Sequence, residues 1–160
     1  MSVGLDHAGL SVADLDAAVA FYGAAFGFAP EFPFELGVDG IRGIMLRLQS
    51  GGRLELFERP GAEPGPAPES PIAALATSGY GHIAVSAPDI DVVFTRALEA
   101  GTSERVSPRA SPEPGVRFAF LADPESNLVE LVERAEASPG GLASGRELAQ
   151  GLARTAGGGA

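Results

Sequence analysis

A duplication constrains the fold of this chain more than any other feature of its sequence. When the sequence is aligned with itself at an offset of 75 residues, His7 matches His82 and Glu55 matches Glu130 without a gap. The chain has only these two histidines, and each precedes its matched glutamate by 48 residues. Self-similarity at a fixed period is the signature of a repeated structural unit. The sequence therefore predicts two copies of one small module.

Each copy has the same predicted pattern of secondary structure. In the first copy, Asp14 stands at an N-cap position and apolar residues follow at helical spacing until Gly27. Short β-prone segments around this helix predict strands at 4–12, 31–37, 42–49 and 53–58. In the second copy, a helix follows Pro88-Asp89 and has Gly101 as its C-cap. The strands expected there are 80–87, 104–108, 116–122 and 127–133. The pattern predicts an α+β fold of two tandem βαβββ modules.

Composition marks the borders of the modules. Pro60 to Pro71 contains five prolines and two glycines in twelve residues, which is typical of a linker. We expect a first module at 1–59, a linker with a short helical turn at 60–78, and a second module at 79–135. A Gly/Ala-rich tail is expected at 136–160, with a short helix at Ser144–Arg154.

The charge balance and the residue types argue against several classes of function. The net charge is −10 and the pI is near 4.5, so we expect no nucleic-acid partner and no anionic membrane surface. The absence of cysteine removes disulfides, thiolate metal ligands and cysteine nucleophiles. The chain has no run of about 18 apolar residues, and its N-terminus lacks a signal-peptide pattern. We expect a cytoplasmic protein that binds a small-molecule substrate.

Strand alternation places the matched glutamates on the face opposite their apolar neighbours, because residues two apart share one face of a strand. If the two modules pack about a pseudo-twofold axis, His7, Glu55, His82 and Glu130 converge. Two imidazoles and two carboxylates suit Zn, Ni, Co, Mn or Fe(II), and ligand type alone does not choose among them. A single histidine or glutamate on a strand is more often a solvated surface residue. The matched spacing favours one divalent metal per site.

The residues around these positions resemble the vicinal oxygen chelate superfamily, which includes glyoxalase I, extradiol dioxygenases and bleomycin resistance proteins. The resemblance covers about residues 4–134. It rests on Leu5–Leu15, Leu54-Glu55-Leu56, Tyr80–Val85, Asp123-Pro124 and Val129-Glu130-Leu131. It implies an open, U-shaped, eight-stranded barrel around a metal site. It also implies that the four matched residues are the metal ligands, a set like that of glyoxalase I, in which a ligating glutamate also acts as the base.

Departures from bacterial glyoxalase I weaken the expectation of glutathione recognition. That enzyme has an arginine in the first strand where this chain has Ser11, and an asparagine shortly after a ligand position where Phe57-Glu58-Arg59-Pro60 offers none. Ser126 also stands where the superfamily commonly has a glycine in a turn.

Three functions are open at this point. We expect first a divalent-metal-dependent, glyoxalase-like lyase or isomerase that acts on a small substrate with two neighbouring oxygens. The reaction would pass through a metal-stabilised enediolate, with Glu130 or Glu55 as the catalytic base. The alternatives are an extradiol-type dioxygenase with Fe(II) and a non-catalytic antibiotic-binding resistance protein. The last needs an aromatic cleft, whereas we expect the phenylalanines to fill a core. The rings in question are Phe32, Phe34, Phe57, Phe118 and Phe120.

We expect a homodimer, because the resemblance implies one and an exposed sheet edge gives it a physical motive. The modules could pair within one chain or between two chains. The residues expected in the substrate pocket are Ser11, Arg53, Phe57, Ser86 and Val132. Arg47 and Arg117 are further arginines that could reach the same cavity. For the arginines we prefer surface salt bridges, in a chain with 21 acidic residues.

Overall fold

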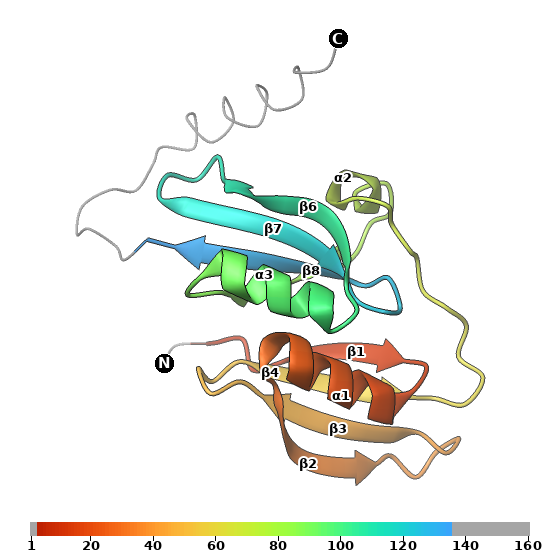
Figure 1. Ribbon diagram of the computed structural model, residues 1–160. Coiled ribbons are helices and arrows are strands. Elements are labelled where there is room, and N and C mark those ends of the chain that lie inside the picture. Colours follow the sequence, from red (N-terminus) through yellow and green to blue (C-terminus); the bar gives the residue numbers. More distant parts are fainter. Residues whose placement is uncertain (1–2, 136–160) are drawn as a thin grey trace.

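The computed structural model describes residues 3–135 and has the α+β architecture predicted from the sequence (Figure 1). Two βαβββ modules follow one another along the chain, and each has its own four-stranded sheet. The predicted helix at Ser144–Arg154 and the rest of the tail lie outside the described residues. Within the described part, no helix is both long and apolar enough to cross a membrane.

The two modules share one topology. The first module contains β1 (Ala8–Val12), α1 (Leu15–Phe26), β2 (Ala29–Glu35), β3 (Arg42–Arg47) and β4 (Arg53–Glu58). The second contains β5 (Ile83–Ser86), α3 (Ile90–Glu99), β6 (Ser103–Ala110), β7 (Val116–Ala122) and β8 (Leu128–Arg134), and α2 (Pro71–Ala74) lies in the connection. The strand orders are β1-β4-β3-β2 and β5-β8-β7-β6. In each sheet the first two strands are parallel and the other pairs are antiparallel. The sequence repeat is therefore a repeat of structure.

The first strand of each module is shorter than predicted. β1 begins at Ala8 and β5 at Ile83, so His7 and His82 precede their strands by one residue instead of lying within them. Each partner strand extends one residue further at this end. Ala8 pairs with Leu54, the second residue of β4, and Ile83 pairs with the second residue of β8.

Both long helices start where the sequence predicts. The Asp14 side chain accepts a hydrogen bond from a backbone N–H three residues on, at 2.9 Å, and Asp89 does the same at 3.1 Å. α1 ends at Gly27, whose φ of 81° is the left-handed conformation that costs glycine little. α3 ends one residue before the predicted position, with Ala100 at the cap and Gly101 following at a φ of 105°.

A shared apolar core joins the two modules. α1 and α3 lie side by side (Figure 1), and their buried residues belong to one cluster with the apolar residues of both sheets. Leu54 and Leu56 of β4 and Val129 and Leu131 of β8 are fully buried in this cluster. The predicted alternation is confirmed at these positions. Because burial of apolar surface is the dominant stabilising term, the core also holds the modules together.

Polar contacts add to this junction. The Tyr22 hydroxyl of α1 donates a hydrogen bond of 2.8 Å to Asp123, which follows β7 and is also buried. Burial and the neighbouring Asp123 carboxylate raise the pKa of Tyr22 far above its ordinary value, so the hydroxyl remains a donor. Arg96 of α3 donates to the carbonyl oxygen of Ala25 in α1 at 2.9 Å. These contacts hold the two modules in one relative position.

A matched ion cluster anchors the start of each helix. Glu58 accepts hydrogen bonds from the backbone N–H of Leu15 at 2.8 Å and from Arg42 at 2.9 Å. In the second module, Glu133 accepts from the N–H of Ile90 at 3.2 Å and from Arg117 at 3.1 Å. An anion at a helix N-terminus is favoured by the free N–H groups and the helix dipole.

Arg117 also pairs with Asp91 of α3, at 2.9 Å. It therefore lies on the helix side of the sheet. The expectation of a salt bridge is confirmed, and the alternative that Arg117 reaches the same cavity as Arg53 and Glu55 is wrong.

The cluster at Glu58 predicts a pH-dependent part of the folding stability. The N–H of Leu15 and the guanidinium of Arg42 hold the pKa of Glu58 below its ordinary value of 4.5. A lowered pKa in the folded state stabilises the protein above the unfolded-state value, and this stabilisation is lost as the pH falls through the folded-state value. The urea midpoint of Glu58→Gln should therefore fall less steeply between pH 6 and pH 3 than that of the wild type.

The matched control is Glu63→Gln, at an exposed linker position. It should keep the wild-type profile. Parallel profiles for the wild type and Glu58→Gln would contradict the assignment.

Candidate metal site

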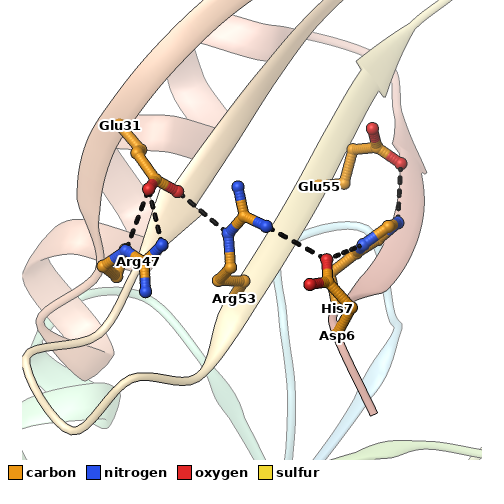
Figure 2. A network of polar contacts seen from close by, with 6 residues as sticks. All are labelled: Asp6, His7, Glu31, Arg47, Arg53 and Glu55. Carbon is orange, nitrogen blue, oxygen red and sulfur yellow. Dashed lines mark hydrogen bonds and ion pairs between the residues drawn. The ribbon is translucent and has the colours of Figure 1, made fainter. Parts of the chain in front are cut away.

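The first predicted ligand pair forms within the first module. Parallel pairing of β1 with β4 places Gly9 beside Glu55. His7, two residues before Gly9, has its Nε2 atom 3.3 Å from Oε2 of Glu55. Both side chains are partly exposed, and Glu55 lies on the sheet face opposite the buried Leu54 and Leu56. Figure 2 shows the two side chains turned toward each other.

The second pair repeats this arrangement. β5 pairs in parallel with β8, which places Ala84 beside Glu130. His82 Nε2 lies 3.2 Å from Glu130 Oε2, and the two side chains are about as exposed as those of the first pair. The ring of His82 also meets Phe120 of β7 edge-on, with centroids 5.1 Å apart. One local geometry thus occurs twice, at residues related by the offset of 75.

The two pairs do not gather into one cluster within the chain. Among residues 3–135, no group of three or more histidine, cysteine, aspartate and glutamate side chains is placed to hold a metal ion. The structure therefore brings each histidine to its own glutamate and leaves the two pairs as separate half-sites.

Each half-site has the geometry of two adjacent metal ligands. Two ligand atoms that each lie about 2.1 Å from an ion are about 3.0 Å apart at a right angle and about 3.4 Å apart at the tetrahedral angle. The two N–O distances fall between these values. Imidazole nitrogen and carboxylate oxygen also match the preferences of first-row divalent ions. The residues of each pair therefore fit a divalent metal.

Asp6 influences the first half-site, and sequence reasoning assigned it no role. Its carboxylate hydrogen-bonds Nδ1 of His7 at 2.7 Å and raises the pKa of that imidazole above its ordinary value. The charge of Glu55 acts in the same direction, against the effect of desolvation. The same hydrogen bond lowers the pKa of Asp6. The repeat held a sign of this role, because the two copies differ at this position: Asp6 of the first copy is matched by Gly81 in the second.

The predicted pocket residues lie on the faces that carry the ligands. Ser11 is beside Phe57 and Ser86 is beside Val132 in the two parallel ladders. Arg53 precedes Glu55 by two residues and lies directly across the ladder from Arg47. Both arginines bind Glu31, and Arg53 also binds Asp6 at 3.0 Å. The expected salt bridges are therefore confirmed for these two arginines.

Aromatic rings cover part of the same faces. Phe32 is 45% exposed, and Phe34, Phe57 and Phe118 are half-buried. Phe34 contacts Phe57 edge-on at 5.5 Å, and Phe118 contacts Phe120 at 6.0 Å. The expectation that these rings fill a core is wrong except for Phe120, which is buried. Their strand positions share the face of the glutamates, away from the helices that complete the core.

In both modules an aromatic ring covers the same place on the sheet face that carries the glutamate, and in the first module Gly43 makes this possible. The ring of Phe34 lies against Gly43, and a Cβ added at this glycine would overlap the ring. Gly43 is matched in the repeat by Phe118. The first module therefore places a ring from β2 over the position that a phenylalanine of β7 occupies in the second.

Residues 4–131 match the Glyoxalase/Bleomycin resistance protein/Dioxygenase superfamily. The chain belongs to this superfamily. The match spans both modules and contains all four predicted ligands. The superfamily includes enzymes such as glyoxalase I and also non-catalytic resistance proteins, so membership alone does not assign an activity. Among curated proteins, none matches the chain significantly.

Solved structures of the superfamily have the same fold. A glyoxylase/bleomycin resistance protein/dioxygenase domain from Frankia sp. is 20% identical, with a TM-score of 0.69, over 86% of this chain and 96% of that one. A glyoxalase family protein from Enterococcus faecalis is 22% identical, with a TM-score of 0.66, over 81% and 97%. Glyoxalase I from Zea mays is 22% identical, with a TM-score of 0.65, over 82% of this chain and 45% of its own length.

Proposed function

We propose that this protein is a divalent-metal-dependent, glyoxalase-like lyase or isomerase that acts on a small substrate with two neighbouring oxygens. The observation that supports it most is the repetition of one His–Glu pair, with N–O distances of 3.3 and 3.2 Å that suit adjacent ligands of one ion. Membership in a superfamily that contains glyoxalase I supports the same function.

The ligands would be His7, Glu55, His82 and Glu130. A divalent cation, when bound, would withdraw electron density from two neighbouring substrate oxygens and so acidify the adjacent C–H group. A carboxylate oxygen of Glu130 or Glu55 would take that proton, as the general base. Return of the proton to the neighbouring carbon completes an isomerisation, and departure of a leaving group from that carbon completes a lyase reaction.

The pocket residues would position the substrate. The apolar side chains of Phe57 and Val132 would pack against its carbon skeleton, and the hydroxyls of Ser11 and Ser86 are available to its oxygens. Arg53 lies at the edge of the first half-site, where it is already engaged by two carboxylates. The role of Arg53 is therefore structural. Because its charge is already paired, the substrate needs no anionic group to neutralise it.

A second copy of the chain would complete each site. The buried Tyr22–Asp123 hydrogen bond and the packing of α1 on α3 hold the modules of one chain in a fixed relative position. The first pair of one chain would therefore meet the second pair of its partner across a twofold axis, which gives a dimer with two equivalent sites.

Metal content tests both the ligands and the dimer. The wild type, purified without chelators, is expected to contain about one divalent ion per chain, because four ligands serve each site. Two matched variants each remove one half-site: His7→Gln/Glu55→Gln and His82→Gln/Glu130→Gln. Each should retain little metal, because two protein ligands remain for each ion.

Co-expression of the two variants distinguishes pairing between chains from pairing within a chain. Half of a random population of dimers contains one chain of each kind, and one of the two sites in such a dimer has all four ligands. Metal content should therefore return to about one quarter of the wild-type value. No return would place the site within one chain. Wild-type protein without metal, and without a metal-dependent change in melting temperature, would overturn the proposed function.

The identity of the metal distinguishes this activity from a related one. Turnover only with Fe(II) and O₂, after anaerobic reconstitution, would assign an extradiol-type dioxygenase in place of the lyase or isomerase. Turnover with Zn, Ni, Co or Mn in the absence of O₂ supports the proposal.

The aromatic faces favour a second candidate function, that of a non-catalytic resistance protein. Exposed or half-buried rings such as Phe32, Phe34, Phe57 and Phe118 suit stacking against a flat antibiotic. Calorimetric titration of chelator-treated protein with bleomycin tests it. Binding that does not depend on metal, together with metal-free wild-type protein, would assign sequestration.

A further inference from the structure

A chain of charged contacts leads into the first half-site (Figure 2). Arg47 donates to Glu31 through two nitrogen atoms, at 3.0 and 2.6 Å, and Glu31 accepts from Arg53 at 2.9 Å. Arg53 donates to Asp6 at 3.0 Å, and Asp6 is 2.7 Å from Nδ1 of His7. Four charged residues thus form one connected support behind a single histidine.

The contact with Asp6 determines which nitrogen of His7 carries its hydrogen. An ionised carboxylate accepts hydrogen bonds and donates none, so a neutral His7 bonded to Asp6 has its hydrogen on Nδ1. The lone pair of Nε2 then faces Oε2 of Glu55, 3.3 Å away. Two acceptors at this distance repel each other unless a proton or a metal cation lies between them.

The second module has the ligand pair without the support. The residues that match Asp6, Glu31, Arg47 and Arg53 are Gly81, Val106, Ala122 and Leu128, and none of them carries a charge. The second module nevertheless forms the same βαβββ fold. Its His–Glu distance is 3.2 Å, close to the 3.3 Å of the first pair. The βαβββ fold therefore forms in the second module without these charged contacts, and in the first module the contacts end at His7.

We propose that Asp6 is a positioning residue, which holds His7 as the Nδ1–H tautomer with Nε2 directed at Glu55, and that Arg53 holds Asp6 in place. His7 is thereby oriented in advance, whereas His82 has an aromatic neighbour in place of a carboxylate. A hydrogen-bond partner of this kind on the far nitrogen of a metal-binding histidine raises its affinity for the ion. The inference concerns the proposed metal ligand, and the tautomer is measurable in metal-free protein.

Nitrogen NMR tests the tautomer directly. Long-range ¹H–¹⁵N spectra of the ¹⁵N-labelled, chelator-treated protein at pH 8.5 contain two imidazoles, which His82→Gln assigns. We expect the Nδ1–H tautomer at His7 in the wild type. In Asp6→Ala, the ring should change to the mixture or the opposite tautomer of an unrestrained imidazole. Asp6→Asn should retain Nδ1–H, because the amide oxygen still accepts. Asp6 is 69% exposed, so these variants are expected to fold, which circular dichroism checks.

A matched variant introduces the counterpart of Asp6 into the second half-site. A Cβ at Gly81 would meet no atom closer than 3.9 Å, so Gly81→Asp is sterically allowed. It should shift His82 toward the Nδ1–H tautomer. An unchanged His7 tautomer in Asp6→Ala would overturn the inference, whatever Gly81→Asp does.

Zn²⁺ affinity, measured by competition with a chromophoric chelator, gives an independent readout. Asp6→Ala should weaken Zn²⁺ binding about 10- to 100-fold, and Asp6→Asn should weaken it less. Unchanged affinity in Asp6→Ala would overturn the role in metal binding. Wild-type protein that binds no Zn²⁺ but shows the expected tautomers would overturn the proposed function and leave the positioning of His7 supported.

Discussion

Replacing Glu130 or Glu55 with glutamine is expected to lower the rate of proton exchange at the substrate carbon by about 10²- to 10⁴-fold in at least one of the two variants. A carboxamide has nearly the size of a carboxylate and can still offer an oxygen to a metal ion, but it cannot accept the proton. The loss should therefore appear in the chemical step, with a smaller effect on metal content. A loss confined to one variant identifies the base.

The exchange is measurable by ¹H NMR in D₂O with a panel of small α-hydroxyketones, beginning with dihydroxyacetone, whose oxygens lie on neighbouring carbons. Glu63→Gln, at an exposed position in the linker, is the control and should exchange at the wild-type rate. If both Glu130→Gln and Glu55→Gln exchange as fast as the wild type, neither glutamate is the base.

Replacing Leu131 with alanine is expected to lower the free energy of unfolding by about 2 to 5 kcal/mol. The side chain is 0% exposed and packs in the core that the two modules share. Its truncation therefore leaves a cavity in this shared core. Urea denaturation followed by circular dichroism measures the loss. Leu75→Ala is the control, because Leu75 is 77% exposed in the linker region, and it should change the stability by no more than about 0.5 kcal/mol.

The shape of the same unfolding curve is a further test of the shared core. One cooperative transition is expected for the wild type and for Leu131→Ala, because neither module keeps its buried face without the other. Two separate transitions, with only the second affected by Leu131→Ala, would show that the modules fold independently.

Much of the fold could be predicted because its causes are local in sequence. An aspartate before a helical apolar pattern and a glycine after it place α1, and the same rules place the start of α3. The alternation in β4 and β8 separates the buried leucines and valine from the glutamates, since strand periodicity determines the face of each side chain. The offset of 75 then relates the two half-sites without any knowledge of the tertiary structure.

Other features depend on contacts that leave no local signal. Glu31 reaches both Arg47 and Arg53 from a segment of β2 where the register shifts between Pro30 and Phe32. A bulge of this kind changes which face the following residues occupy, so alternation counted along the sequence fails there. The helix-side position of Arg117 is similar, because Asp91 and Glu133 approach it from different elements.

The sequence by itself determined the duplicated module, the matched positions of the two histidines and two glutamates, and the sheet face on which each glutamate lies. These properties follow from the alternation of side chains along single strands and from the fixed offset of the repeat, neither of which depends on tertiary packing. Only the tertiary structure decided that the two pairs remain apart in one chain and that Asp6 and Arg53 support His7 alone. The packing of α1 on α3 sets the separation of the modules, and such packing depends on many side chains at once, each with a small contribution.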